Sequence, residues 1–443
     1  MRVWATRTVL AMALVAGVVL APTPVGGGRA GRVPTGFERR GGTLWTTLAE
    51  ERDYLRDLVA AAPGPERAGW GAARVTVTRV GTSTRGRPLE LITVAGTRSV
   101  AEPVRVLFVC GQHGDEPAGR ESCLKLIRDL AADRSPAGRR LLERVTVLVL
   151  ATPNPDGSAA GTRATAEGVD LNRDHVAVST PEARAIRRVL REARPHIVHD
   201  LHEFTVPADT ANSTPALYLW PRNLNVAPEL RSLAVELARD RIGTALPAAG
   251  WAAGVYGEED TGRPLGGDGD ERLLRNAAAL DHAVAVLVEV ATRPVSALER
   301  ADPGLLGRRR VAAHLVAAQA TLRMAAERGE AITAAVRTSR ERAARGGGAV
   351  YFAGADNVPA GLGAVGPMPC AYRLTPDRYA SARAALAEHG VRVEPDLRVE
   401  TAQPAGAMVA LLLDPRARFA VATATPEPCP ADPDRAPTPA EPV

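Results

Sequence analysis

Residues 104–133 read VRVLFVCGQHGDEPAGRESCLKLIRDLAAD, and this run sets the architecture of the chain. Its first six residues are mostly apolar and rich in β-branched side chains, which is typical of a strand buried on both faces. Residues 118–133 predict a helix, and a second apolar run, VTVLVL, follows at 145–150. A strand, a helix and a strand joined by a connection of this length predict a parallel βαβ unit.

The same alternation of strands and helices continues along the chain. Further strands are predicted at 74–81, 88–96, 196–201 and 283–290, and further helices at 38–66, 181–192, 228–245 and 270–282. The first two of these strands are joined by the turn TSTRGR. We therefore expect an α/β domain over residues 38–298, with a mixed, largely parallel twisted sheet flanked by helices.

Four other segments differ from this domain in composition. Residues 1–28 have a positively charged start, an apolar stretch and then small residues, the pattern of a secretory signal peptide. Residues 299–345 are rich in Ala and Arg and predict a helical linker. Residues 346–427 predict a small α+β domain in which AVYF, AYRL and MVALLLD form short strands, and the proline-rich residues 428–443 predict a disordered tail.

The signal pattern predicts a secreted or extracytoplasmic protein. Its apolar core, Val9–Ala21, is shorter than the ~20 residues that a membrane span needs, so an uncleaved anchor is the less favoured alternative. No later segment is apolar enough to cross a bilayer, and we expect no stable membrane span after signal removal.

Charge and cysteine content limit the function further. The net charge of +5 is small for 443 residues, and no basic block contains interleaved aromatic residues, which argues against nucleic-acid binding. Cys110, Cys123, Cys370 and Cys429 allow disulfides in an exported chain, and pairing within each half is the simplest arrangement. The sequence does not determine this connectivity, and an additional metal ligand is the alternative role of Cys110.

Polar side chains lie near the carboxyl ends of four predicted strands. His113 and Glu116 follow 104–109, the NPDG motif (154–157) follows 145–150, His202 follows 196–201, and Glu289 lies near the end of 283–290. Because ligands of open α/β sheets gather at the carboxyl ends of strands, we expect these groups to meet at one edge. Two histidines and one carboxylate with an open fourth position are typical of a catalytic zinc, and Glu289 would then serve as general base.

Each of these features has an ordinary structural explanation when taken alone. HxxE pairs are common without a metal, Glu289 could be a strand-end residue that faces solvent, and Asn172–Arg173 could be a surface pair. In the DLHE motif, His199 competes with His202 as the ligand. The order of all the motifs along the chain decides between these explanations.

That order resembles the zinc carboxypeptidase family, the carboxypeptidase A-like metallopeptidases. The similarity covers residues 75–295 and comprises GTSTRGRPLEL (81–91), HGDE (113–116), NPDG (154–157), Arg163, GVDLNRD (168–174), DLHE (200–203) and LVEVATR (287–293). The resemblance implies one Zn²⁺ per chain, held by His113, Glu116 and His202.

The resemblance also implies roles for the other matching residues. Asp170 would accept a hydrogen bond from the far nitrogen of a ligand histidine, and Arg163 would stabilise the oxyanion that forms during hydrolysis. Asn172 and Arg173 would bind the terminal carboxylate of the substrate. Glu289 would take a proton from the attacking water and pass it to the leaving amine.

Two positions depart from the family pattern. The best-known members carry an arginine directly before the ligand glutamate, where this chain has Asp115. They also carry a substrate-contacting tyrosine on a loop before the base. Tyr256 lies between His202 and Glu289 and is the candidate for this role, but 33 residues separate it from Glu289, which departs from the family's spacing.

The sequence therefore predicts an exported zinc carboxypeptidase that acts on peptides with a free C-terminal carboxylate. The anionic Asp115 suggests a substrate that bears an amine, such as a cell-wall peptide with diaminopimelate. The alternative is a zinc amidohydrolase or deacylase similar to the succinylglutamate desuccinylase and aspartoacylase group, which shares the HGxE, DLNR and DLH motifs. The NPDG motif and the GRPL hairpin favour the peptidase, and the presence of every ligand and of the base argues against an inactive binding module.

Overall fold

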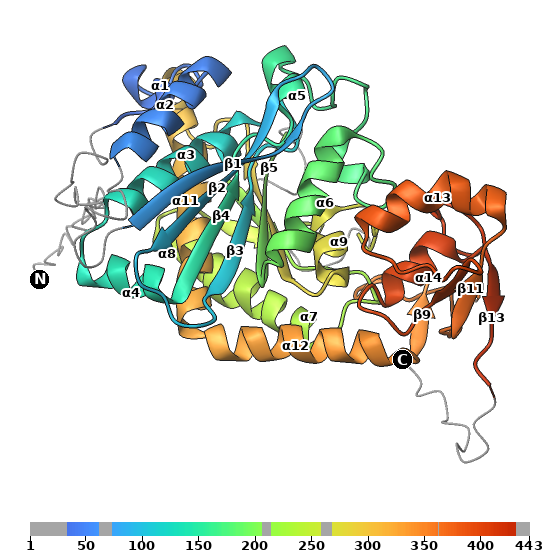
Figure 1. Ribbon diagram of the computed structural model, residues 1–443. Coiled ribbons are helices and arrows are strands. Elements are labelled where there is room, and N and C mark those ends of the chain that lie inside the picture. The colour runs from blue at the N-terminus through green and yellow to red at the C-terminus, as the bar shows by residue number, and fades with distance from the viewer. Residues whose placement is uncertain (1–32, 62–72, 206–213, 258–267, 362, 431–443) are drawn as a thin grey trace, which may run out of the picture.

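The computed structural model describes residues 33–61, 73–205, 214–257, 268–361 and 363–430 (Figure 1). The predicted signal peptide and residues 431–443 of the predicted tail lie outside these ranges. None of the described helices combines the length and the apolar character that a membrane span requires.

A mixed sheet forms the centre of the molecule and has the strand order β1-β2-β4-β3-β5-β8-β6-β7. The strands are β1 (Ala73–Thr82), β2 (Pro88–Gly96), β3 (Val104–Val109), β4 (Val145–Leu150), β5 (Ile197–Phe204), β6 (Ala216–Leu219), β7 (Ala253–Val255) and β8 (Val284–Ala291). The central strands β4, β3, β5 and β8 run parallel, whereas β2 and β6 join them by antiparallel pairing. The predicted mixed, largely parallel sheet is confirmed.

Helices cover both faces of the sheet, as parallel strands require. The α-helices of the described residues are α1 (Gly36–Arg39), α2 (Leu48–Ala61), α3 (Pro117–Ala132), α4 (Pro136–Arg144), α5 (Pro155–Ala160), α6 (Pro181–Ala193), α7 (Pro228–Val235), α8 (Gly243–Ala248), α9 (Leu274–Leu280), α10 (Ala297–Ala301), α11 (Pro303–Glu327) and α12 (Gly329–Arg345), followed in the C-terminal segment by α13 (Pro376–Glu388) and α14 (Ala407–Leu413). Several begin with proline after a capping side chain, as α6 does where the Thr180 hydroxyl accepts from the backbone N–H of Ala183. Figure 1 shows α3 and α11 on one side of the sheet and α6 on the other.

The segment 299–345 is helical, but it does more than connect two parts of the chain. The Ala-rich face of α11 is buried in the main hydrophobic core, because small side chains let the helix approach the sheet closely. Ala313, Ala317 and Ala320 lie on this buried face. The segment therefore packs as part of the main α/β domain.

The segment after α12 forms a small α+β unit beside the main sheet (Figure 1). Its strands are β9 (Ala349–Tyr351), β10 (Val365–Pro367), β11 (Ala371–Arg373), β12 (Arg398–Glu400) and β13 (Thr425–Glu427). The run MVALLLD forms most of helix α14, so the predicted strand there is wrong. An apolar run that is buried on all sides has no periodicity that separates a helix from a strand.

Two disulfides join the four cysteines within each half of the chain. Cys110 at the end of β3 pairs with Cys123 on α3, and Cys370 beside β11 pairs with Cys429. The predicted pairing is confirmed. The alternative role of Cys110 as a metal ligand is wrong, because its sulfur is bonded to Cys123.

Candidate active site

Three side chains converge at the carboxyl edge of the sheet. His113 and Glu116 follow β3, and His202 lies on the neighbouring strand β5. Glu116 Oε1 lies 2.7 Å from His113 Nδ1, Glu116 Oε2 lies 2.9 Å from His202 Nδ1, and the two Nδ1 atoms are 3.1 Å apart. All three side chains are buried, and no other such group of three occurs among the described residues. Two imidazole nitrogens and one carboxylate around one point are a donor set that fits zinc.

A tight contact between two glycines holds the ligand loop in place. A Cβ atom on Gly114 would lie 2.0 Å from the carbonyl carbon of Gly157, so only glycine lets the loop pass the NPDG turn. Asn154 of that turn donates from Nδ2 to the backbone oxygen of Gln112 over 3.0 Å. The NPDG motif thus positions the strand end that carries the first two ligands.

The surroundings of the group are strongly anionic. Burial favours a neutral His202, but Asp200 and Glu116 outweigh it and raise the pKa of His202 well above its usual value. Burial likewise opposes a charge on Asp170, yet His113 and Arg163 hold the pKa of Asp170 below its usual range. Such a cluster favours a bound cation.

Asp170 and Arg163 lie where the sequence predicts a role for them. Asp170 Oδ1 lies 3.1 Å from His113 Nε2, the ring nitrogen that points away from the group. Arg163 donates from Nε to Asp170 Oδ2 over 3.1 Å, and its Nη1 lies 3.4 Å from Glu116 Oε1. A half-exposed guanidinium therefore stands at the open side of the three ligands.

Glu289 lies on β8 directly opposite His202 in the register of the two parallel strands. Burial raises the pKa of Glu289 to about 7, and the charge of Glu116 adds to this effect while His202 opposes it. Its Oε2 atom is buried and has no hydrogen-bond partner among the described residues. The carboxylate is thus close to the candidate metal ligands, and one of its two oxygens is left without a partner among the described residues.

Asn172 and Arg173 lie on a short 3₁₀ turn (Leu171–Arg173) but face different surroundings. Asn172 is buried: its Oδ1 accepts from the backbone N–H of Leu274 over 2.8 Å, and its Nδ2 lies 3.0 Å from His202 Nε2. Arg173 is exposed and donates to the backbone oxygen of Asn172 over 2.9 Å. The neutral Asn172 amide is thus enclosed by the protein, whereas the charged Arg173 side chain is accessible from solvent.

Tyr256 reaches the same region despite its distance along the chain. It follows β7, and its N–H donates to the backbone oxygen of Tyr218 on β6, the strand that pairs with β8. Burial raises the pKa of Tyr256, and the charge of Glu289 raises it further, whereas Arg173 lowers it. The sheet therefore brings Tyr256 within electrostatic range of both groups.

Comparison with known proteins agrees with this geometry. The zinc carboxypeptidase family model matches residues 71–206, the part of the chain that holds the three ligands, Arg163 and Asp170. Over residues 71–206 the chain is therefore similar to the zinc carboxypeptidase family.

The chain is similar to several carboxypeptidases over part of its length. Carboxypeptidase 2 of Trichophyton tonsurans is 34% identical over 223 residues, which are 47% of this chain and 41% of the fungal protein. Carboxypeptidase D of Homo sapiens is 30% identical over 150 residues, 30% of this chain and 10% of the human protein. A metallo-carboxypeptidase from Pseudomonas aeruginosa, solved with (2-guanidinoethylmercapto)succinic acid, has 20% identity and a TM-score of 0.46, and the likeness covers 63% of this chain and 68% of that one. The chain spans about two fifths of the length of the fungal relatives it matches.

Sequence reasoning missed two residues of the candidate site and left a third undecided. Asp200 is fully buried, and its Oδ1 lies 3.0 Å from His202 Nε2. Gln112 is also buried and donates to Asp200 over 2.7 Å. The period of two along a strand places Asp200 on the same side of β5 as His202, and this signal could have found it. By the same rule His199 points the other way, and its Nδ1 lies 2.9 Å from Thr321 Oγ1 on α11 instead of in the ligand group.

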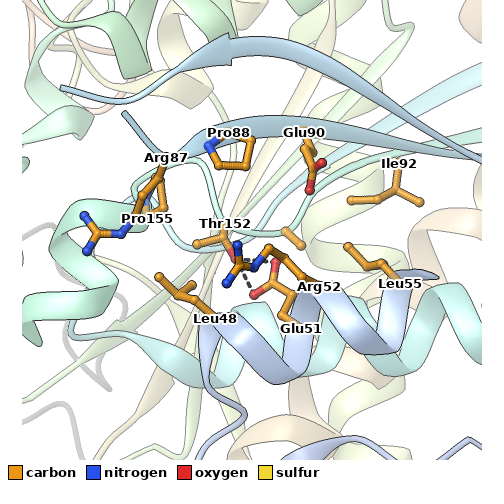
Figure 2. Close-up of a pocket in the computed structure, with 11 residues that line it drawn as sticks. Leu48, Glu51, Arg52, Leu55, Arg87, Pro88, Glu90, Ile92, Thr152 and Pro155 are labelled. Carbon is orange, nitrogen blue, oxygen red and sulfur yellow. Dashed lines mark hydrogen bonds between the residues drawn. The ribbon is translucent and has the colours of Figure 1, made fainter. Parts of the chain in front are cut away.

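A separate pocket of about 120 Å³ lies between α2 and β2 (Figure 2). Its lining includes Leu48, Glu51, Leu55, Arg87, Glu90 and Thr152. Two of the charged groups have partners: Thr152 donates to Glu51 over 2.8 Å, and Arg87 forms an ion pair with Asp156. His113, Glu116 and His202 do not line this pocket.

Proposed function

We propose that this protein is an exported zinc carboxypeptidase that hydrolyses the C-terminal peptide bond of peptides. The observation that carries the proposal is the position of Glu289 opposite His202, at the edge where His113 and Glu116 also lie, with its buried Oε2 atom lacking a hydrogen-bond partner among the described residues. A structural metal site would have no use for such a carboxylate, because burying it without a partner is unfavourable. A hydrolytic site needs it as a base.

The three ligands and Glu289 would have different roles in hydrolysis. His113, Glu116 and His202 would hold Zn²⁺, which when bound polarises the scissile carbonyl and acidifies water. Glu289 accepts the proton of the attacking water and returns it to the leaving amine. A pKa of about 7 suits a group that must do both near neutral pH.

Two arginines would bind the negatively charged groups of the substrate. Arg163, whose Nη1 lies 3.1 Å from His113 Nδ1, stabilises the negative charge that develops on the carbonyl oxygen. Arg173 binds the terminal carboxylate, because its guanidinium is exposed and can make two parallel hydrogen bonds. Tyr256 closes the site on the side of Glu289 and contacts the bound peptide.

Export and substrate class are the finer parts of the proposal. The pattern of residues 1–28 and the two disulfides support export, since disulfides persist in oxidising compartments. Asp115 is exposed beside Glu116 and makes the neighbouring surface anionic, which supports a peptide that bears an amine, such as a cell-wall peptide with diaminopimelate. Equal hydrolysis of such peptides and of plain peptides ending in Ala or Leu would count against this substrate.

The proposal is tested by metal content and hydrolysis of a peptide library, measured on the wild type and on Glu289→Gln. We expect one zinc per chain in both proteins and C-terminal trimming in the wild type alone. Zinc without trimming, but with acyl release from N-acyl amino acids, would support the deacylase. Absence of zinc from the wild type would contradict the proposed site.

A further inference from the structure

Each histidine of the metal group has a carboxylate on the nitrogen that points away from the group. For His113 this is Asp170, whose role the family resemblance implies. For His202 it is Asp200, to which neither the motifs nor the family likeness assigns a role. Asp200 Oδ1 lies 3.0 Å from His202 Nε2, and both side chains are buried. The two residues are adjacent on one face of β5, so the strand itself holds this pair in place.

A chain of buried side chains continues behind Asp200. Gln112 donates from Nε2 to Asp200 Oδ1 over 2.7 Å, and Gln112 Oε1 lies 2.7 Å from His175 Nε2. An ionised carboxylate can only accept hydrogen bonds, so the nitrogen end of Gln112 must face Asp200. The oxygen end then faces His175, whose Nε2 must carry the hydrogen. This order of donors and acceptors orients Asp200 as an acceptor for His202.

His202 Nε2 also has a competing neighbour. Asn172 Nδ2 lies 3.0 Å from it, and Asn172 Oδ1 already accepts from the backbone N–H of Leu274, which fixes the orientation of the amide. Asn172 can therefore only donate to His202 Nε2. That bond needs an imidazole whose hydrogen sits on Nδ1, the atom that faces Glu116 and His113. In this tautomer Nδ1 has no lone pair for a metal.

We propose that Asp200, held by Gln112 and His175, is a positioning residue that selects the tautomer of His202 that binds zinc. Asp200 accepts the hydrogen of Nε2 and leaves the Nδ1 lone pair directed at the ligand group. The hydrogen bond from His202 Nε2 to the charged Asp200 is stronger than the hydrogen bond from the neutral Asn172 amide to His202 Nε2. The tautomer with its hydrogen on Nε2 is therefore favoured. The inference rests on the proposed zinc site. It adds Asp200, Gln112 and His175 as residues that raise the affinity of that site for zinc.

The experiment measures zinc affinity directly, by competition with a chromophoric chelator, and needs no peptide substrate. Removal of a carboxylate behind a ligand histidine lowers metal affinity by about 10–100-fold, and we expect this loss for Asp200→Asn. The matched control is Glu121→Gln, which changes another fully buried carboxylate to an amide on α3, and neither oxygen of Glu121 has a hydrogen-bond partner among the described residues. The control should bind zinc like the wild type. Thermal unfolding of the metal-free variants shows whether each one folds.

A second variant distinguishes tautomer selection from a general structural effect. In Asp200→Asn/Asn172→Asp a carboxylate returns to the same nitrogen of His202 from the other side. We expect it to bind zinc more tightly than Asp200→Asn alone, and the visible spectrum of its Co²⁺ form to return toward that of the wild type. A structural role for Asp200 predicts no such recovery.

The outcomes separate this inference from the proposed function. Wild-type zinc affinity in Asp200→Asn, or a double variant no tighter than Asp200→Asn, would overturn tautomer selection. If the wild type still binds zinc and trims peptides in that case, the proposed function stands. A wild type that binds no zinc overturns both.

Discussion

Glu289 of β8 and His202 of β5 lie directly opposite each other in a parallel pair of strands, so their side chains project to the same face of the sheet. The pairing places a carboxylate with a partnerless buried oxygen next to a candidate metal ligand, and both residues lie on strands. Because burial raises the pKa of Glu289 to about 7, its charge changes within the pH range in which enzymes work. The consequences for catalysis can be measured.

Activity should fall as the pH drops below about 7. Glu289 is then protonated and cannot accept the proton of water, so we expect kcat/KM to fall about tenfold per pH unit on the acid side. Glu289→Gln should lower kcat by about 10²–10⁴ and remove this limb from the residual activity. The measurement is a pH–rate profile of both proteins, and an unchanged limb in the variant would assign it to another group.

Arg173→Ala should weaken substrate binding more than the chemical step. Its exposed guanidinium binds the carboxylate in the ground state and the transition state alike, so we expect KM to rise about tenfold with a smaller change in kcat. Steady-state kinetics on a free peptide and its C-terminal amide provide the check. If the wild type hydrolyses both equally, this role for Arg173 is wrong.

Arg163→Ala should have the opposite kinetic signature. The charge that Arg163 stabilises develops only in the transition state, so kcat should fall by about 10²–10³ with little change in KM. Arg163→Lys keeps the charge but not the contact to both Asp170 and Glu116, and we expect partial activity. A rise in KM alone would contradict the placement.

Gly114→Ala should disrupt the metal site through packing. The added Cβ would lie 2.0 Å from the backbone of Gly157, and overpacking of this kind costs about 1–3 kcal/mol or more. We expect a lower melting temperature and weaker zinc binding, measured by calorimetry and chelator competition. The control is Gly361→Ala, where a Cβ would meet open space.

His314 should make the protein sensitive to acid. It is fully buried on α11, neither ring nitrogen has a hydrogen-bond partner among the described residues, and burial, with His199 and His202, lowers its pKa to about 3. The unfolded chain takes up a proton below pH 6.5, whereas the folded chain does not until about pH 3. Stability is therefore present above pH 6.5 and lost as the pH falls.

The size of this effect follows from the two pKa values. Between pH 6.5 and pH 5 the loss from one such histidine is ~2 kcal/mol. His314→Leu should remove it, so the free energy of unfolding in urea should fall less between pH 7 and pH 5 in the variant than in the wild type. Identical pH dependence in both proteins would show that His314 is protonated in the fold.

Much of the architecture could be predicted because its signals are local. The apolar runs of β3 and β4 and the helical sequence between them predict the parallel βαβ unit. The turn TSTRGR predicts the hairpin of β1 and β2. The four cysteines lie near enough in the chain for pairing within each half. The ligand motifs come at strand ends, and strand ends meet at an edge.

Other features could not be predicted from local sequence patterns, because they depend on contacts between segments that are far apart in the chain. The run MVALLLD is buried as helix α14, and the Ala-rich α11 packs against the sheet, because the surrounding elements decide which surface is covered. Tyr256 reaches Glu289 because β7 and β6 fold back along β8.

The order of residues was sufficient to predict strands, helices and the candidate ligands, since hydrophobic period and motif spacing act along the chain. Only the tertiary structure revealed that Asp200, Gln112 and His175 form one buried hydrogen-bonded chain behind His202. Hydrogen bonds between side chains join residues from separate strands and loops, and their direction depends on which donors and acceptors burial brings together.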